Sequence, residues 1–141
     1  MMLVATFQKG WMVGLDSMLA GHRLQSKQHV VKLSDGTVIE NMNGAMAPEL
    51  WARGERDAVL EYLRGDVVRT YELAEQVSVC GMLKFVSRTG KLHCVTAAKL
   101  HTVREMMGFP EPDVSWMDNP PTRESFVAWM CNAKNILENQ K

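Results

Sequence analysis

The sequence predicts an α+β chain that is predominantly helical, and three observations lead to this class. Apolar residues recur at three- and four-residue spacing through much of the chain, which is the period of an amphipathic helix. Two pairs of β-prone runs flank turn signals, one at Asp35-Gly36 and one at 87–90. The chain has 141 residues, of which 46% are hydrophobic and 23% charged, as in a globular domain. We therefore expect a single domain over residues 1–141.

The first half is expected to hold a strand, a helix and a small hairpin. Residues 1–7, "MMLVATF", are apolar and β-prone and predict a strand. Residues 13–24 carry apolar side chains at helical spacing. The runs "HVVKL" and "TVIE" on either side of the Asp-Gly turn predict a hairpin or an ordered loop. A short helix around Leu50 and Trp51 follows.

The longest helix is expected to begin near Glu55, with acidic residues in its first turn. Gly65 lies inside it, although glycine costs about 1 kcal/mol relative to alanine in a helix. Its presence indicates that another part of the chain packs close to the backbone. The apolar stripe expected to face the core consists of Val59, Leu60, Leu63, Val67, Thr70, Tyr71 and Ala74.

The second half begins with a predicted strand, turn and strand over 81–97. The run "AAKLHTVREMMGF" then predicts a helix closed by Gly108. Residues 110–121 hold four prolines in twelve positions and predict an irregular connector, anchored by Trp116 and Met117. The last amphipathic helix begins at about Thr122.

Charge and cysteine content restrict the partners and the compartment. Lys plus Arg equals Asp plus Glu, at 16 each, so no overall field draws the chain to nucleic acid or to an anionic membrane. Cys80, Cys94 and Cys131 are odd in number and form no CxxC pair, which favours buried free thiols in a reducing compartment. No apolar run approaches the roughly 20 residues of a membrane span, and the N-terminus lacks a signal-peptide pattern. We expect a cytoplasmic protein without a membrane partner.

Two groups of residues are candidates for function. Lys84, Arg88 and Lys91 surround the turn of the second hairpin, and they either contact a phosphate backbone or form a solvated turn. Tyr62 and Asp66 are four residues apart and share one face of the long helix. A carboxylate in that position can bind a metal, and a phenol can orient a water. The spacing alone is common in helices and assigns neither role.

Residues 13–76 add a context for this pair. In order, they contain "GLDSMLAGHRLQSK", a loop with "DG", "LWARGERDAVLEY", the pattern Tyr-x-x-x-Asp at Tyr62 and Asp66, and "VVRTYELAE". This ordered set resembles the C-terminal part of a ribonuclease H-like 3'-5' exonuclease domain. The subclass is the acidic-plus-tyrosine one that includes polymerase proofreading domains. The resemblance divides the chain into an exonuclease-like part over 1–79 and a hairpin plus helical tail over 80–141.

The resemblance implies roles for both residues. In such enzymes the aspartate helps to hold two divalent metals, Mg or Mn, and the tyrosine positions the attacking water, so these roles would fall to Asp66 and Tyr62. The family's first motif, Asp-x-Glu on the first strand, and its second, an aspartate on a helix, both precede the part matched here. We therefore expect a truncated ribonuclease H-like C-terminal half that lacks both. One carboxylate cannot hold two cations about 3.5–4 Å apart.

These considerations predict a non-catalytic module that binds protein, nucleic acid or both, as a subunit or an internally started product of an exonuclease. Such a half exposes an apolar face, so we expect a protein partner or a homo-oligomer. Alone, the chain would need no cofactor. The alternative is a composite 3'-5' exonuclease dependent on Mg or Mn, to which this chain contributes Tyr62 and Asp66. A third reading is a small helical interaction protein in which the resemblance is accidental.

Overall fold

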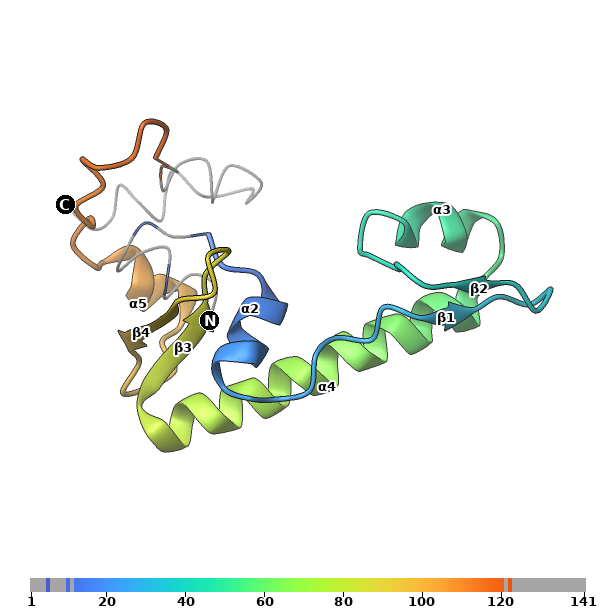
Figure 1. Ribbon diagram of the computed structural model, residues 1–141, viewed down its shortest axis with the longest axis horizontal. Helices are drawn as coiled ribbons and strands as arrows, with labels where there is room; N and C mark the ends of the chain where they lie inside the picture. The colour runs from blue at the N-terminus through green and yellow to red at the C-terminus, as the bar shows by residue number, and fades with distance from the viewer. Residues whose placement is uncertain (1–4, 6–9, 11, 121, 123–141) are drawn as a thin grey trace.

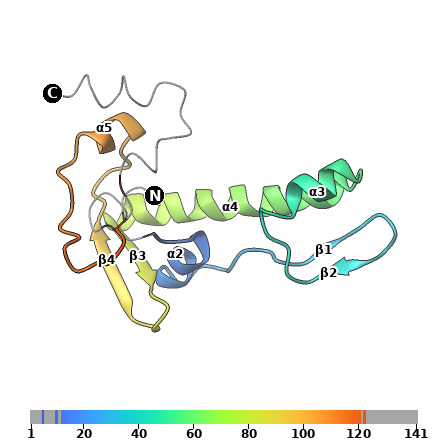
Figure 2. The same ribbon diagram turned by 90° about the horizontal axis from the view of Figure 1, so that it is seen from above.

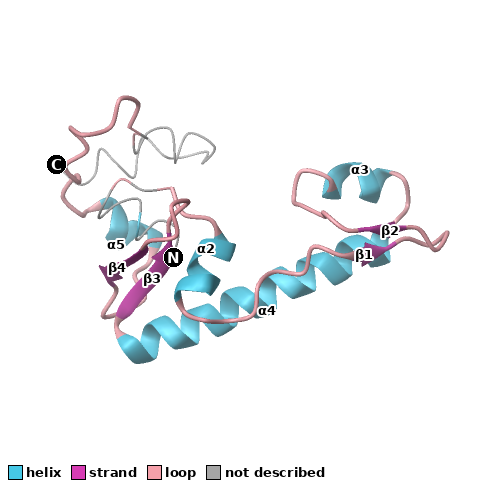
Figure 3. Cartoon of the chain, viewed as in Figure 1, coloured by secondary structure: helices cyan, strands magenta, loops and turns pink. Residues whose placement is uncertain are grey.

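The computed structural model describes most of the chain, namely residues 5, 10, 12–120 and 122. The described residues form four helices and two two-stranded antiparallel sheets, which confirms the α+β class. The longest element is α4 (Arg56–Cys80), with 25 residues. The other elements lie along one side of α4 in two groups, one near each of its ends (Figure 1). Figure 3 shows the same arrangement by secondary structure.

The group near the N-terminal end of α4 is a short hairpin followed by a short helix. The strands β1 (Val31–Lys32) and β2 (Val38–Ile39) pair around a turn in which Gly36 has a φ of 88°, a value that favours glycine. The helix α3 (Ala47–Ala52) begins with a proline in its first turn. Together they bury one apolar cluster against α4, formed by Val31, Leu33, Met42, Leu50, Ala58, Val59 and Tyr62.

The group near the C-terminal end of α4 contains α2 (Leu15–Gly21), β3 (Met82–Val86), β4 (Leu92–Thr96) and α5 (Val103–Met107). Gly81, in the left-handed conformation with a φ of 66°, ends α4 and turns the chain into β3. The second apolar cluster is formed by Ala5, Val13, Met18, Leu19, Leu73, Val77, Leu83, Phe85, Val95, Ala97, Met106 and Met107.

Helix α2 packs directly onto the backbone of β3 through Gly21. A Cβ atom at Gly21 would lie 2.5 Å from backbone atoms of Lys84 and Phe85, so only glycine allows this approach. The next residue, His22, accepts a hydrogen bond at Nε2 from the backbone N–H of Lys84, at 2.9 Å. The contact covers part of the free edge of β3, which would otherwise present unpaired backbone groups.

Most predicted elements of residues 13–120 are present, with three corrections. The helix closed by Gly108 begins at Val103, several residues later than expected, because Thr102 and Glu105 form a capping box there. Trp116 does not anchor the connector, since 61% of its surface is exposed. Cys80 and Cys94 are free thiols as predicted, but they are exposed and not buried.

Two predicted elements concern the termini. The expected strand over 1–7 lies outside the described residues except for Ala5, which is helical and buried. The last helix also lies outside the described residues, as does Cys131.

The predicted core stripe of α4 was wrong. The helix buries Ala58, Val59, Tyr62, Leu73 and Val77, and of these only Val59 belongs to the predicted stripe. The exposed fractions of the stripe residues Leu60, Leu63, Val67 and Tyr71 are 52%, 45%, 67% and 63%. Apolar residues occur on more than one side of this helix, so their spacing does not identify the side that other elements cover.

The close approach of α2 and β3 makes a prediction about Gly21. The substitution Gly21→Ala should lower the free energy of unfolding by about 2–3 kcal/mol, because a methyl group meets backbone that cannot move independently. Urea unfolding followed by circular dichroism measures this loss. Gly44→Ala is the control, since a Cβ there has no neighbour within 4 Å. Equal effects of the two substitutions would contradict this account of the contact.

The hydrogen bond at His22 predicts a pH dependence of stability. Burial, followed by the positive charge of Lys84, lowers the pKa of the His22 imidazole. The unfolded chain therefore binds a proton more readily, and the free energy of unfolding should fall as the pH drops below the unfolded pKa of about 6.5. His22→Gln retains an acceptor but does not titrate. Between about pH 7.5 and about pH 5.5 the variant should lose less stability than the wild type in urea unfolding; parallel losses would refute the assignment.

Candidate functional site

Tyr62 and Asp66 lie on the covered side of α4, and the structure brings Lys27 to both. The Lys27 ammonium lies 3.1 Å from the Tyr62 hydroxyl and 3.1 Å from Oδ2 of Asp66. It also lies 5.3 Å from the centre of the Tyr62 ring, within the range of a cation–π contact. One cation therefore joins the two residues of the exonuclease-like motif.

Lys27 belongs to the extended segment that links α2 to β1. Figures 1 and 2 both show this segment running beside α4. Polar contacts attach it to the helix on either side of Lys27. Gln25 accepts a hydrogen bond from the Arg69 guanidinium, and the Gln28 amide donates to Glu61 at 3.1 Å. The segment is thus held along about two turns of α4.

Asp16, in the first turn of α2, holds the backbone of Lys27 in place. Its Oδ1 accepts a hydrogen bond from the backbone N–H of Lys27 at 3.1 Å, and its Oδ2 lies 3.4 Å from Nε2 of His29. From the sequence, Asp16 was considered only as a substitute metal ligand that its spacing does not favour, and Lys27 was given no role. The signal was nevertheless present, because "LDSM" and "LQSK" supply these two residues and are parts of the run that resembles an exonuclease.

The electrostatics of the cluster favour a charged lysine. Burial alone would lower the pKa of the Lys27 ammonium, but its hydrogen bonds to Tyr62 and Asp66 and the negative charge of Asp66 outweigh this effect and raise the pKa. The side chains of Lys27 and Asp66 are only 17% and 27% exposed. The charge of Asp66 is therefore compensated inside the chain.

One oxygen of Asp66 is left without a partner. Its Oδ1 is buried and accepts no hydrogen bond within the described part of the chain. A buried acceptor of this kind is unfavourable by about 1–3 kcal/mol when unsatisfied. This oxygen could accept a hydrogen bond from a further donor or bind an additional ligand.

The cluster does not fit the two-metal centre that the exonuclease resemblance implies. Such a centre needs several oxygen ligands around each cation. Here the Lys27 ammonium already lies against Oδ2 of Asp66 and would repel a metal. Among the residues described, no three His, Cys, Asp or Glu side chains are grouped so as to hold a metal ion.

Gly65, between Tyr62 and Asp66, was expected to lie against a neighbouring backbone. Its neighbour is the side chain of Gln28, and a Cβ at Gly65 would lie 3.6 Å from Cβ of Gln28. This is ordinary van der Waals contact. The linking segment does pack here, but the packing leaves room for alanine.

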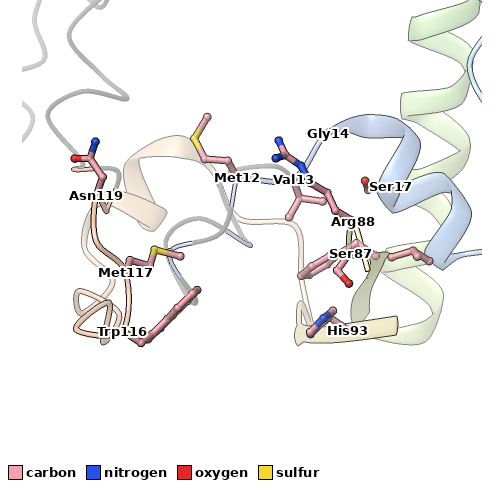
Figure 4. A pocket seen from close by; sticks show the side chains of 13 residues that line it. Met12, Val13, Gly14, Ser17, Ser87, Arg88, His93, Trp116, Met117 and Asn119 are labelled. Atoms are coloured by element: carbon pink, nitrogen blue, oxygen red, sulfur yellow. The ribbon is translucent and has the colours of Figure 1, made fainter. Parts of the chain in front are cut away.

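The predicted nucleic-acid residues lie on the β3–β4 hairpin, away from this cluster in sequence and in the fold. Lys84 is half-buried within β3, whereas Arg88 and Lys91 are exposed at the turn. Arg88 lines a cleft of about 720 Å³ between residues 10 and 12–17, the hairpin and residues 116–119 (Figure 4). Lys84 and Lys91 do not line it.

The walls of this cleft are mainly apolar, with a few polar groups. Trp116 forms one wall with 61% of its surface exposed, and His93 stacks on Phe85 with 5.4 Å between ring centres. An exposed indole and a guanidinium can together contact a planar, anionic group.

Comparison with known proteins gives no assignment, because no protein family, curated protein or solved structure was found to match the chain. The resemblance to an exonuclease therefore stands on its quoted residues alone. Within residues 12–120, none of the helices combines the length and the apolar character that a membrane crossing requires.

The Lys27–Asp66 pair makes a prediction about stability. Lys27→Met and Asp66→Asn should each lower the free energy of unfolding by about 1–3 kcal/mol, because each leaves the other group partly buried without its partner. In the double variant, the free energy of unfolding should fall by less than the sum of the two single losses. Urea unfolding measures all three.

The matched control is Lys99→Met. Lys99 pairs with Glu105 at 2.8 Å, but these side chains are 63% and 43% exposed. Lys99→Met should therefore lower the free energy of unfolding by less than about 1 kcal/mol. Additive effects of Lys27→Met and Asp66→Asn would show that the pair is not coupled.

Proposed function

We propose that this chain is a non-catalytic binding module derived from a ribonuclease H-like 3'-5' exonuclease domain, and that its partner is a protein. One observation carries the proposal. The Lys27 ammonium lies between the two residues that would act in catalysis, 3.1 Å from each. The motif then serves to attach the linking segment to α4.

Physical chemistry favours this reading of the motif. A carboxylate that is already paired with an ammonium gains little from a metal, which would bring a second positive charge beside the first. The Tyr62 hydroxyl accepts a hydrogen bond from Lys27, so the lysine already occupies one hydrogen-bonding position of this oxygen. Both catalytic roles are therefore replaced by structural ones.

A protein partner is supported by the side chains that the fold leaves exposed. Along α4 these include Leu60, Leu63, Val67, Val68, Tyr71 and Val79. Several large apolar side chains exposed on one helix of a small protein are typical of an interaction site. The exposed thiols of Cys80 and Cys94 support a reducing compartment, which we take to be the cytoplasm.

Nucleic acid is a second ligand class, supported by the exposed Arg88 and Lys91 and by the cleft with Trp116. Two phosphate contacts would give binding that weakens steeply with salt. We place this role below protein binding because the chain carries no net positive charge.

The alternative is a composite exonuclease, and one observation favours it. Oδ1 of Asp66 is buried and unpaired among the described residues, so a ligand that reached this oxygen would have no hydrogen bond to displace. Another polypeptide or a second copy would have to supply further carboxylates, and Lys27 would have to leave Asp66. In that case Tyr62 and Asp66 would return to the roles that the family resemblance implies.

A nuclease assay tests the proposal. The purified full chain is incubated with 5'-labelled single-stranded DNA or RNA in the presence of Mg or Mn. It should degrade each substrate no faster than the Asp66→Ala variant does. Asp118→Ala controls for loss of an exposed carboxylate elsewhere. Divalent-dependent turnover that is lost in Asp66→Ala and kept in Asp118→Ala would overturn the non-catalytic reading.

A further inference from the structure

We propose that the cleft beside the β3–β4 hairpin binds one nucleotide, with its base against Trp116 and its phosphate at Arg88. This inference deepens the second ligand class of the proposed function and rests on it, because it names the unit of nucleic acid that the chain would hold. The carrying observations are the size of the cleft, its aromatic walls and the single charge among its lining residues.

The cleft has the size of a small-molecule site. Its volume of about 720 Å³ falls within the range of about 300–1,000 Å³ that is usual for ligand pockets. Three segments that are distant in sequence enclose it, namely residues 10 and 12–17, the β3–β4 hairpin and residues 116–119. The fold of the whole C-terminal group, and not one loop, therefore shapes this cleft.

Aromatic and apolar side chains form most of its walls. Trp116 and Met12 both line the cleft, and 61% and 66% of their surfaces are exposed. Figure 4 shows His93 on the opposite side of the cleft from Trp116. The His93 ring stacks on Phe85 with an angle of 14° between the ring planes. Aromatic faces of this kind are the surfaces on which nucleobases stack.

The charge of the cleft favours an anion. Arg88 is exposed at the hairpin turn, and it is the only Arg, Lys, Asp or Glu among the described residues that line the cleft. No carboxylate in the described part of the chain pairs with its guanidinium. A guanidinium can bind a phosphate through two N–H groups at once. The cleft thus offers a position for a phosphate at the edge of an apolar hollow.

Two uncharged polar side chains complete the lining. Ser17, in α2, and Asn119, in the connector, reach the cleft from different segments. Neither side chain has a hydrogen-bond partner among the described residues. A hydroxyl and an amide can bond to sugar hydroxyls and to the polar edge of a base. A simple aromatic acid would leave both unused, so the set fits a base, a sugar and a phosphate better.

Isothermal titration calorimetry of the full chain tests the ligand class, with AMP and UMP as probes. At least one of them should bind with a dissociation constant below about 1 mM. Its nucleoside and ribose 5-phosphate should bind at least about tenfold more weakly, because each lacks one of the two recognised groups. A single strand of about ten nucleotides tells a strand from a free nucleotide. Binding of the strand more than about tenfold tighter than the mononucleotide would identify a strand as the source of the nucleotide, and weaker binding a free one.

Variants place the ligand in the cleft. Trp116→Ala and Arg88→Gln should each raise the dissociation constant at least about fivefold. Trp51→Ala is the control for the first, since this indole is 44% exposed but lies on α3, outside the cleft. Lys91→Gln is the control for the second, since Lys91 is exposed at the same turn and does not line the cleft. Both controls should change the constant less than about twofold, and circular dichroism checks that every variant is folded.

Several outcomes would refute the nucleotide site. One is no binding of AMP or UMP up to about 10 mM. Another is equal affinity for the nucleotide and for ribose 5-phosphate or the nucleoside, which would remove the role of the base or of the phosphate. A third is strand binding that Arg88→Gln and Lys91→Gln weaken alike and Trp116→Ala leaves unchanged. That result would keep nucleic acid as a ligand class and exclude the cleft, so the two proposals fail separately.

Discussion

The arrangement of this protein depends on the attachment of one extended segment to α4 by Lys27. The residues from α2 to β1 contain little apolar surface to bury, so polar contacts must hold them. Lys27 supplies the central contact, with Tyr62 and Asp66 each at 3.1 Å, and Asp16 fixes its backbone. This segment connects the two apolar clusters. Its path along the helix therefore sets where both clusters form on α4.

The two clusters share one helix, and this explains why α4 has a covered and an exposed side. Each group of elements is too small to bury a core alone, and each completes its apolar cluster with residues of α4. Because the linking segment is short and lies along one side, both groups pack on that side. The apolar residues elsewhere on the helix remain at the surface, although they resemble core residues in type and spacing.

Local features of the fold could be predicted from the sequence, whereas the contacts between distant segments could not. Glycine and turn signals located both hairpins, because those residues act on their own backbone. The buried side of α4 was predicted wrongly, since it depends on where residues 23–30 lie. The four-residue spacing predicted that Tyr62 and Asp66 share one face of α4. It could not predict Lys27, which is 35 residues from Tyr62 in sequence and linked to it by no periodicity. Only the quoted "LQSK" indicated that the lysine belonged to the same region.

The role of a motif such as Tyr-x-x-x-Asp is decided by the cation that reaches it. A divalent metal held by several carboxylates gives a centre for hydrolysis, whereas a single ammonium gives a neutral, hydrogen-bonded pair. An internal lysine is always present in the folded chain, so a metal would have to compete with a partner tethered at high effective concentration. The lysine therefore resists replacement unless the linking segment moves.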